Sequence, residues 1–193
     1  MKYSALAIEG CFLIEHEVFP DNRGFFREWF KMSVNEELGN KLDVAQANLS
    51  ISKQGVIRGL HYSTADSGQK KLITSVYGSI NDVLIDIRIG SPTFLNQVCI
   101  ELSCDSGRTV LIDSGVAHGF SVLSENAGVA YLTSSEYSPE FERGINPHDC
   151  ELSVDWNIPS GVHEIISQTD ASSITFAEAR KAHALPNFST VGR

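Results

Sequence analysis

Long apolar runs are absent from this sequence. No stretch of about 18 consecutive apolar residues, the length that spans a bilayer as a helix, occurs in the chain. Residues 1–17 carry acidic side chains where a secretory signal needs a basic flank followed by an apolar stretch. We therefore expect neither a membrane span nor a secretory signal.

Cysteine is scarce as well. The four cysteines, Cys11, Cys99, Cys104 and Cys150, form no CxxC pair and no zinc-like grouping with histidine. Reduced, structural thiols are typical of the cytoplasm, where disulfides rarely persist. The sequence thus predicts a cytoplasmic protein.

Positive charge is also in short supply. Lys and Arg together number 15 against 24 Asp and Glu, which gives a formal net charge of −9. Nucleic acids and anionic membranes bind cationic surfaces, so this balance argues against both as general partners. It leaves room for a local basic pocket that holds a phosphorylated small molecule.

The residues that are present suit one globular domain. The chain of 193 residues is 42% hydrophobic and 20% charged, which is ordinary for a protein with a substantial core. No internal repeat, low-complexity tract or linker divides it. We therefore expect a single domain.

Much of the chain alternates between apolar and polar side chains with a period of two. Such short strands at close spacing predict an all-β sandwich or barrel rather than alternating strands and helices. Residues 20–24 carry a turn signal, and an aromatic strand follows at 25–30. Short helices are expected at 33–40 and at 173–184. Further strands are expected at 81–89, 97–103, 108–113, 120–123 and 128–133.

The strand expected at 44–52 has one polar and one apolar face. Polar, uncharged side chains at the even positions from Gln46 to Ser52 share one face, and apolar ones from Ala45 to Ile51 share the other. The polar face would be normal against solvent, and equally at home lining a wet ligand cavity inside a small barrel. The alternation leaves both arrangements open.

Residues 54–62 place two reactive side chains in a segment that otherwise indicates a strand. Arg58 is a fixed cation suited to an anionic group such as a phosphate, and His61 exchanges protons near neutral pH. Gly55 and Gly59 permit tight turns or a close backbone approach. The alternative is an edge strand with one surface arginine and one histidine at the rim of the core.

A series of motifs extends from this segment in both directions. They are DNRGFFRE (21–28), QANLS (46–50), GVIRGLHY (55–62), Lys71-Leu72, DVLIDIR with GSPTF (82–94), AHGF (117–120), Tyr131, YSP with ERGI (137–145) and SQTD (167–170). In this order and spacing, from about residue 6 to 188, the chain resembles the nucleotide-sugar epimerases typified by dTDP-4-dehydrorhamnose 3,5-epimerase. The joint pattern is highly specific, although no single piece would be.

The resemblance implies a fold and an activity. The expected fold is all-β, a cupin-like double-stranded β-helix (jelly roll) with short peripheral helices. One epimerase domain would comprise residues 1–193, with its core at about 6–170 and a C-terminal helix at about 173–184. The implied activity is that of an isomerase on a dTDP-4-keto-6-deoxyhexose, in dTDP-L-rhamnose or related deoxysugar biosynthesis. The family acts as a homodimer without metal or organic cofactor.

Four residues match the catalytic groups of the family. The ketone at C4 of the substrate acidifies the hydrogens at C3 and C5, so epimerisation needs a base, an acid on the opposite face and a group that holds the enolate charge. His61 matches the base, and Asp170 the carboxylate that orients it. Tyr131 matches the acid, although alone it would be one more aromatic strand residue. Lys71 matches the cation beside the C4 oxygen.

The remaining matches are substrate contacts. Arg23 and Arg58 match the groups that pair with the pyrophosphate, for which a bidentate guanidinium is well shaped. Packing is the alternative role for Phe19 and Tyr137, and a hydrogen bond to backbone is the alternative for His118. The full set of nucleotide and sugar contacts is Glu28, Gln46, Asn48, His118, Glu142, Phe19 and Tyr137.

Two residues near the motifs depart from the family. Thr169 stands where lysine is frequent, and Ser63 stands where glutamine is usual. The catalytic set stays intact, but the choice of rhamnose as the sugar is weakened. Whether C3, C5 or both are inverted stays open.

Two other functions fit a small all-β domain. A metal-dependent cupin enzyme usually carries a His-x-His pair with a carboxylate and another histidine, and no His-x-His occurs in this sequence. A non-catalytic sugar-nucleotide binding module would be expected to have lost the base, its carboxylate or the acid, and all three are present. The epimerase is therefore the predicted function.

Overall fold

The computed structural model describes residues 1–33, 42–65 and 68–188. The helix expected at 33–40 lies, except for Ser33, outside these residues. The described strands and helices are β1 (Lys2–Ala5), β2 (Phe12–Glu15), β3 (Val18–Asp21), β4 (Gly24–Arg27), β5 (Gln46–Lys53), β6 (Val56–Ser63), β7 (Lys71–Tyr77), β8 (Ser79–Ile85), β9 (Gln97–Ser103), β10 (Arg108–Ile112), β11 (Ala117–Val122), β12 (Asn126–Thr133), β13 (Glu142–Gly144), β14 (Ile165–Ile166), α2 (Gln168–Ala171) and α3 (Phe176–Lys181).

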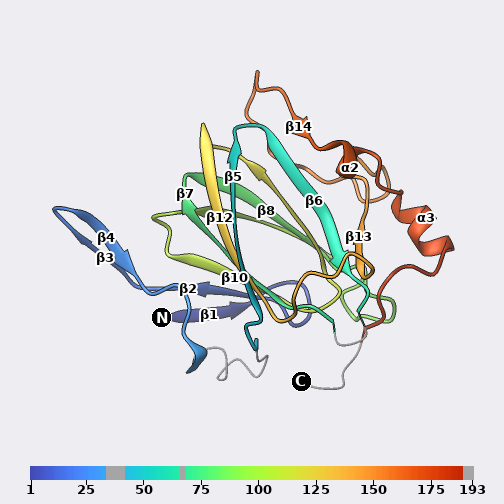
Figure 1. Cartoon of the computed structure of the whole chain (residues 1–193), viewed down its shortest axis with the longest axis horizontal. Helices are drawn as coiled ribbons and strands as arrows, with labels where there is room; N and C mark the ends of the chain where they lie inside the picture. Colours follow the sequence, from blue (N-terminus) through green and yellow to red (C-terminus); the bar gives the residue numbers. More distant parts are fainter. Residues whose placement is uncertain (34–41, 66–67, 189–193) are drawn as a thin grey trace.

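Most strands belong to two sheets that lie one over the other (Figure 1). The first sheet has the order β1-β2-β10-β7-β12-β5, and the second has the order β13-β6-β11-β8-β9, with β14 beside β6. The chain changes sheet at every strand from β5 to β8, and again from β9 to β12. This winding is that of a double-stranded β-helix, so the predicted all-β, cupin-like jelly roll is confirmed.

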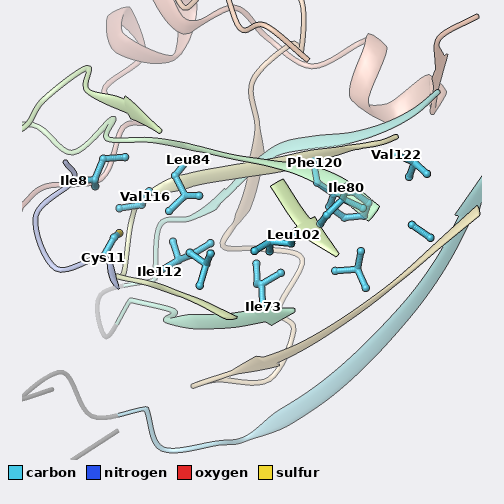
Figure 2. Packing of buried hydrophobic residues seen from close by; sticks show 13 residues of the cluster. Ile8, Cys11, Ile73, Ile80, Leu84, Leu102, Ile112, Val116, Phe120 and Val122 are labelled. Carbon is cyan, nitrogen blue, oxygen red and sulfur yellow. The ribbon is translucent and has the colours of Figure 1, made fainter. Parts of the chain in front are cut away.

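The main core fills the space between the two sheets. Figure 2 shows Ile73 and Ile112 of the first sheet on one side of this core, with Leu84, Leu102 and Phe120 of the second sheet on the other. Burying each such aliphatic or aromatic side chain stabilises the fold by roughly 1.5–3 kcal/mol. The apolar half of each alternating strand therefore holds the two sheets together.

A second core covers the outer face of the second sheet. Ile57 and Tyr62 of β6 and Val83 of β8 are buried there together with Trp156 and Phe176 from the C-terminal part of the chain. Strand β8 therefore has apolar packing on both faces. Any charged side chain on this strand must find a partner in the interior.

The C-terminal helix is shorter than the sequence suggested. The expected helix at 173–184 is replaced by α3, which begins only at Phe176 because Thr175 and Glu178 form a capping box at its N-terminus. Ile174 instead pairs with Ile145 in an isolated bridge, which keeps the preceding backbone extended. The helix ends at Lys181, and His183 takes a left-handed conformation with φ of 53°.

The β3–β4 hairpin stands apart from both sheets, at the left of Figure 1. Its two strands are joined at the turn predicted for residues 20–24, and the predicted aromatic strand ends earlier, at Arg27. Phe19 and Phe26 face one another across the hairpin with ring centroids 6.3 Å apart, and both side chains are exposed. The hairpin thus presents aromatic surface to its surroundings.

None of the described helices combines the length and apolar character needed to cross a membrane. All four cysteines are free thiols, with Cys11 buried and Cys99 and Cys150 exposed.

Candidate active site

The polar face of β5 points into the space between the sheets, which resolves the alternative left open by its alternation. Leu49 and Ile51 on the other face are 65% and 61% exposed. Asn48 pairs with Tyr131 on β12, and Gln46 pairs with Thr133. Directly opposite residues share a face of a sheet. One end of the first sheet therefore carries polar side chains toward the second sheet instead of apolar ones.

Strand β6 brings His61 to the same space from the second sheet. His61 pairs with His118 on β11, so the two imidazoles lie on neighbouring strands. Gly59 makes this pairing possible, because a Cβ at that position would lie 2.6 Å from the Cα of Gly119. Its φ of 118° is also a conformation that favours glycine. The close backbone approach expected for Gly59 is present.

His61 and Asp170 form a hydrogen-bonded pair. The Nε2 atom of His61 lies 2.7 Å from Oδ1 of Asp170, and the carboxylate is buried while the imidazole is 45% exposed. Burial raises the pKa of Asp170, but the hydrogen bond and charge of His61, with bonds from Ser167 and the Gly59 backbone, outweigh it and hold the pKa below its usual value. The carboxylate stays ionised beside the imidazole.

Helix α2 places that carboxylate. Ser167 is the N-cap of α2, and its hydroxyl accepts a hydrogen bond from the backbone N–H of Asp170. The preceding strand, β14, runs parallel to β6 and brings Ile166 beside Ile57. The cap and the strand pairing together fix Asp170 beside His61.

His118 has its own carboxylate partner, which the sequence reasoning missed. Its Nε2 atom lies 2.7 Å from Oδ1 of Asp82 on β8, and Asp82 is fully buried. The partner of His118 is thus a carboxylate and not the backbone of the alternative, and its contact with substrate stays a prediction. An acid at the centre of an apolar strand was the available signal, because a buried carboxylate requires a partner.

Lys71 and Tyr131 enter from the first sheet. Lys71 on β7 pairs with Thr133 on β12, and Tyr131 on β12 pairs with Ile73 on β7. Both side chains lie on the inner face of the sheet. Burial lowers the pKa of Lys71, and the carboxylate of Glu142 opposes that effect. Burial raises the pKa of Tyr131, with Arg58 lowering it and Glu142 raising it. The phenol therefore stays protonated near neutral pH.

Two separate sets of hydrogen bonds hold Arg58 and the row of polar residues along β5. The Nε atom of Arg58 donates to Oγ of Ser52 at 3.0 Å. Gln46 donates to Oδ1 of Asn48 at 2.7 Å, and its own Oε1 accepts from the backbone N–H of Tyr137 at 2.9 Å. The ring of Tyr137 remains largely exposed. These contacts fix the polar groups while leaving the Arg58 side chain in contact with solvent.

Strand β13 adds Glu142 beside the same row. Glu142 pairs with Ser63 on β6, two residues after His61. The Glu142 carboxylate raises the pKa of both Lys71 and Tyr131, in each case by less than the effect of burial. Eight of the predicted residues besides Asp170 thus gather around one space: His61, Tyr131, Lys71, Gln46, Asn48, Arg58, His118 and Glu142.

Three predicted substrate contacts are not part of this cluster. Phe19 and Arg23 lie on the β3–β4 hairpin, which points away from the sheets (Figure 1). Arg23 is highly exposed and pairs with Asp21 at 2.6 Å. Glu28, just after the hairpin, pairs with Lys31. Within one copy of the chain these residues face solvent.

The clustered groups suit proton transfer next to a developing negative charge. A histidine backed by a carboxylate, a protonated tyrosine from the other sheet and a half-buried lysine are what an enolisation requires. Over residues 1–33, 42–65 and 68–188, no group of three or more His, Cys, Asp or Glu side chains is arranged to hold a metal ion.

Sequence comparison finds relatives along nearly the whole chain. The profile of a protein family described as dTDP-4-dehydrorhamnose 3,5-epimerase matches residues 5–178. The chain is 40% identical over 191 residues to a dTDP-4-dehydrorhamnose 3-epimerase of Streptomyces niveus, covering 98% of this chain and 91% of the relative. It is 38% identical over 194 residues to the dTDP-4-dehydrorhamnose 3,5-epimerase of Mycobacterium tuberculosis, covering 100% and 96%.

Solved structures agree with the sequence relatives. The rmlC epimerase of Mycobacterium tuberculosis superposes with a TM-score of 0.93 at 38% identity, covering 97% of this chain and 94% of that one. A 3,5-epimerase of Legionella pneumophila, solved in complex with dTDP-4-keto-L-rhamnose, gives a TM-score of 0.90 at 37% identity, covering 98% and 99%.

Proposed function

Because the chain belongs to the dTDP-4-dehydrorhamnose 3,5-epimerase family, we propose that it inverts C3, C5 or both in a dTDP-4-keto-6-deoxyhexose, with His61 as the base. The chain is an isomerase, a dTDP-sugar 3- or 3,5-epimerase of deoxysugar biosynthesis. The roles of the individual residues are our proposal. A metal-dependent cupin enzyme and a non-catalytic binding module are not favoured by the comparisons.

The His61–Asp170 pair is the observation that carries this mechanism. With Nε2 of His61 held 2.7 Å from the carboxylate, Nδ1 is the nitrogen available to a substrate C–H. The ionised Asp170 stabilises the imidazolium that forms when His61 takes the proton. The same pair would serve for C3 and for C5 if the sugar ring turns to present each hydrogen to His61.

Tyr131 supplies the proton on the opposite face. It lies on β12 in the first sheet, whereas His61 lies on β6 in the second, so a sugar between the sheets has one group on each side. Burial raises the pKa of Tyr131, which favours the protonated form that an acid needs. Inversion follows because the proton leaves toward one sheet and returns from the other.

Lys71 holds the enolate charge in this proposal. Its ammonium is a compact point charge on the inner face of β7, beside Tyr131 on β12. Burial lowers the pKa of Lys71, and a partly desolvated ammonium attracts an enolate oxygen more strongly than a fully hydrated one. His118, held by Asp82, would contact the sugar from the second sheet.

Arg58 marks the end of the site that binds the pyrophosphate. The exposed guanidinium, fixed through Nε on Ser52, keeps both terminal nitrogens available for phosphate oxygens. Gln46, Asn48, Glu142 and Tyr137 would contact the nucleotide and sugar along the same row. The relative solved with dTDP-4-keto-L-rhamnose supports a dTDP-sugar as the ligand of this space.

A homodimer would complete the site. The exposed outer face of β5, with Leu49 and Ile51, and the exposed aromatic residues of the hairpin offer apolar surface to a second copy. We propose that the hairpin of each copy reaches the site of the other and brings Phe19 and Arg23 to the nucleotide. The free thiols of all four cysteines support the cytoplasm as its place of action.

Incubation with dTDP-4-keto-6-deoxyglucose in deuterium oxide, followed by NMR, tests the proposed activity. Exchange at both carbons identifies a 3,5-epimerase, and exchange at one identifies a single-site enzyme. The rate should be the same after treatment with EDTA, because no step uses a metal. A folded protein that gives no exchange at either carbon would refute the proposal.

A further inference from the structure

The β3–β4 hairpin is fastened to the first sheet by one arginine at its end. Arg27 is the last residue of β4, and its Nη2 atom donates to Oγ1 of Thr74 at 3.0 Å and to the backbone carbonyl of Ser75 at 2.6 Å. Thr74 in turn donates to the carbonyl of Arg108 at 2.8 Å. The end of the hairpin is thereby joined to both β7 and β10.

The chain that enters the hairpin is also bonded next to β10. His16 lies between β2 and β3, and its backbone N–H donates to the carbonyl of Gly107 at 2.8 Å. Thr109 on β10 lies opposite Ile14 on β2. On its other side β10 runs antiparallel to β7 with Val110 opposite Ile73, so the next position along places Thr109 opposite Thr74. We call His16, Arg27, Thr74 and Thr109 the hairpin root.

The hairpin root contains buried polar atoms without partners. Among the described residues Nη1 of Arg27 and Oγ1 of Thr109 make no hydrogen bond, and the His16 ring has the backbone of Glu28 as a polar neighbour. Arg27 also forms no salt bridge within the part of the chain that the structure describes. Leaving polar groups unpaired costs stability. A costly arrangement of this kind is retained in proteins mainly where geometry matters.

The angle at which the hairpin leaves the sheet matters because a small tilt at its base displaces its far end. A strand of four residues is about 13 Å long, so a tilt of about 10° at the root moves the far end by about 2 Å. A lone two-stranded hairpin is also only marginally stable and depends on what anchors it. A misplacement of about 1 Å in a binding group is enough to cost a large factor in a reaction.

We propose that Arg27 is a positioning residue that sets the direction of the hairpin and so brings Phe19 and Arg23 to the nucleotide in the site of a second copy. This inference rests on the proposed function, in which the hairpin completes the partner's site. Arg27 itself touches neither substrate nor reacting atoms. It acts through its bonds to Thr74 and Ser75.

His16 makes the hairpin root sensitive to added charge. Burial, followed by the positive charge of Arg27, holds the pKa of His16 at about 4. The amino terminus and Lys31 lower the pKa of His16 further, and the Glu28 backbone opposes them. Burial lowers the pKa of Arg27, and Cys104 and Asp105 oppose that effect. A positive charge at position 16 would therefore be buried close to the Arg27 cation.

Hydrogen exchange of the hairpin amides, measured without substrate, tests the anchor directly. We expect residues 18–27 to exchange at least tenfold faster in Arg27→Met and in Thr74→Val, and by an intermediate factor in Arg27→Lys, which keeps the charge but loses one bond. Arg108→Met is the matched control, since Arg108 is a neighbouring arginine with an exposed side chain that pairs with Glu15 at 3.8 Å. Unchanged hairpin exchange in Arg27→Met and Thr74→Val would overturn the inference.

His16 variants separate charge from shape at the same root. His16→Lys should reproduce the fast hairpin exchange of Arg27→Met, whereas His16→Leu should behave as the wild type. The amides of β8 and β11 report whether each variant is folded. Equal effects of His16→Lys and His16→Leu would contradict the sensitivity to added charge.

Kinetics then link the anchor to the reaction. Arg27→Met should raise the KM for dTDP-4-keto-6-deoxyglucose about tenfold and leave kcat within about twofold, because only the contact to the nucleotide is displaced. A lower kcat at unchanged KM, or the same change in Arg108→Met, would refute the positioning role. If the wild type itself gives no turnover, the proposed function fails, while hydrogen exchange still decides whether Arg27 fastens the hairpin.

Discussion

Replacing Asp170 with asparagine removes the charge beside His61 and little else. Asparagine has nearly the same shape, and its carbonyl still accepts a hydrogen bond from the imidazole across 2.7 Å. The loss is therefore the attraction between the carboxylate and the imidazolium that forms when His61 takes a proton. Ground-state binding of the substrate does not involve Asp170, so KM should change little.

The size of the effect follows from the geometry. Since His61 is 45% exposed, water screens the pair. Opposite unit charges about 3 Å apart in an effective dielectric of about 40–55 attract by about 2–3 kcal/mol, which corresponds to a loss of about 30- to 150-fold in kcat. We expect Asp170→Asn to fall in this range in the rate of deuterium exchange at the reacting carbon.

Two further variants decide whether the reasoning is right. Asp155→Asn, a change of an exposed carboxylate that is not in the site, should leave kcat within about twofold of the wild type. The double variant His61→Asn with Asp170→Asn should be no slower than His61→Asn alone, because Asp170 acts only through His61. A further loss in the double variant, or a wild-type rate in Asp170→Asn, would refute this account of the pair.

Three other predictions concern different parts of the molecule. Tyr131→Phe should still exchange deuterium on the His61 side, while NMR shows the inverted product forming about 100-fold more slowly, because the acid on the other face is gone; equal loss of both signals would assign Tyr131 another role. The pKa of His16 is about 4 in the native protein against 6.5 for an unperturbed histidine. Between pH 4 and 6.5 His16 is therefore protonated mainly in the unfolded chain. The free energy of unfolding then falls as the pH drops from 6.5 toward 4, by at most about 3 kcal/mol. Urea unfolding should show a flatter pH dependence over this range in His16→Leu, and identical slopes would contradict the buried neutral state. Leu49→Asp, at a residue that is 65% exposed, should convert the proposed dimer to a folded monomer in sedimentation, and an unchanged mass would remove β5 from the interface.

The sequence predicted several strands, but it missed β1, β2 and β7 and could not give the orientation of those it found. The period of two in β5 predicted the strand, because alternation is a local property of extended backbone. It could not tell which face is inside, and the face of Leu49 and Ile51 proved to be the outer one. A polar inner face occurs where a cavity must receive a polar ligand, and that depends on the second sheet, which no local pattern describes.

The candidate site depended on the resemblance for its long-range pairs. His61 and Asp170 are 109 residues apart in the chain, and no periodicity connects them. Their bond in the structure agrees with the role that the resemblance gave them. Asp82 was missed although it lies within a recognised motif, because its partner His118 belongs to a different strand. The start of the last helix was misplaced because the capping box of Thr175 and Glu178 begins the helix at Phe176, and the sequence reasoning did not recognise it.

The central claim is that His61 removes the proton from the sugar. The most direct test is the initial rate of deuterium incorporation into dTDP-4-keto-6-deoxyglucose by His61→Asn, compared with His148→Asn, in which an exposed histidine that pairs with Glu164 is changed in the same way. We predict that the exchange which the wild type shows at C3, C5 or both is lost in His61→Asn, by about a thousandfold or more, and is unaffected in His148→Asn. Exchange by folded His61→Asn at a rate near that of the wild type would contradict the account.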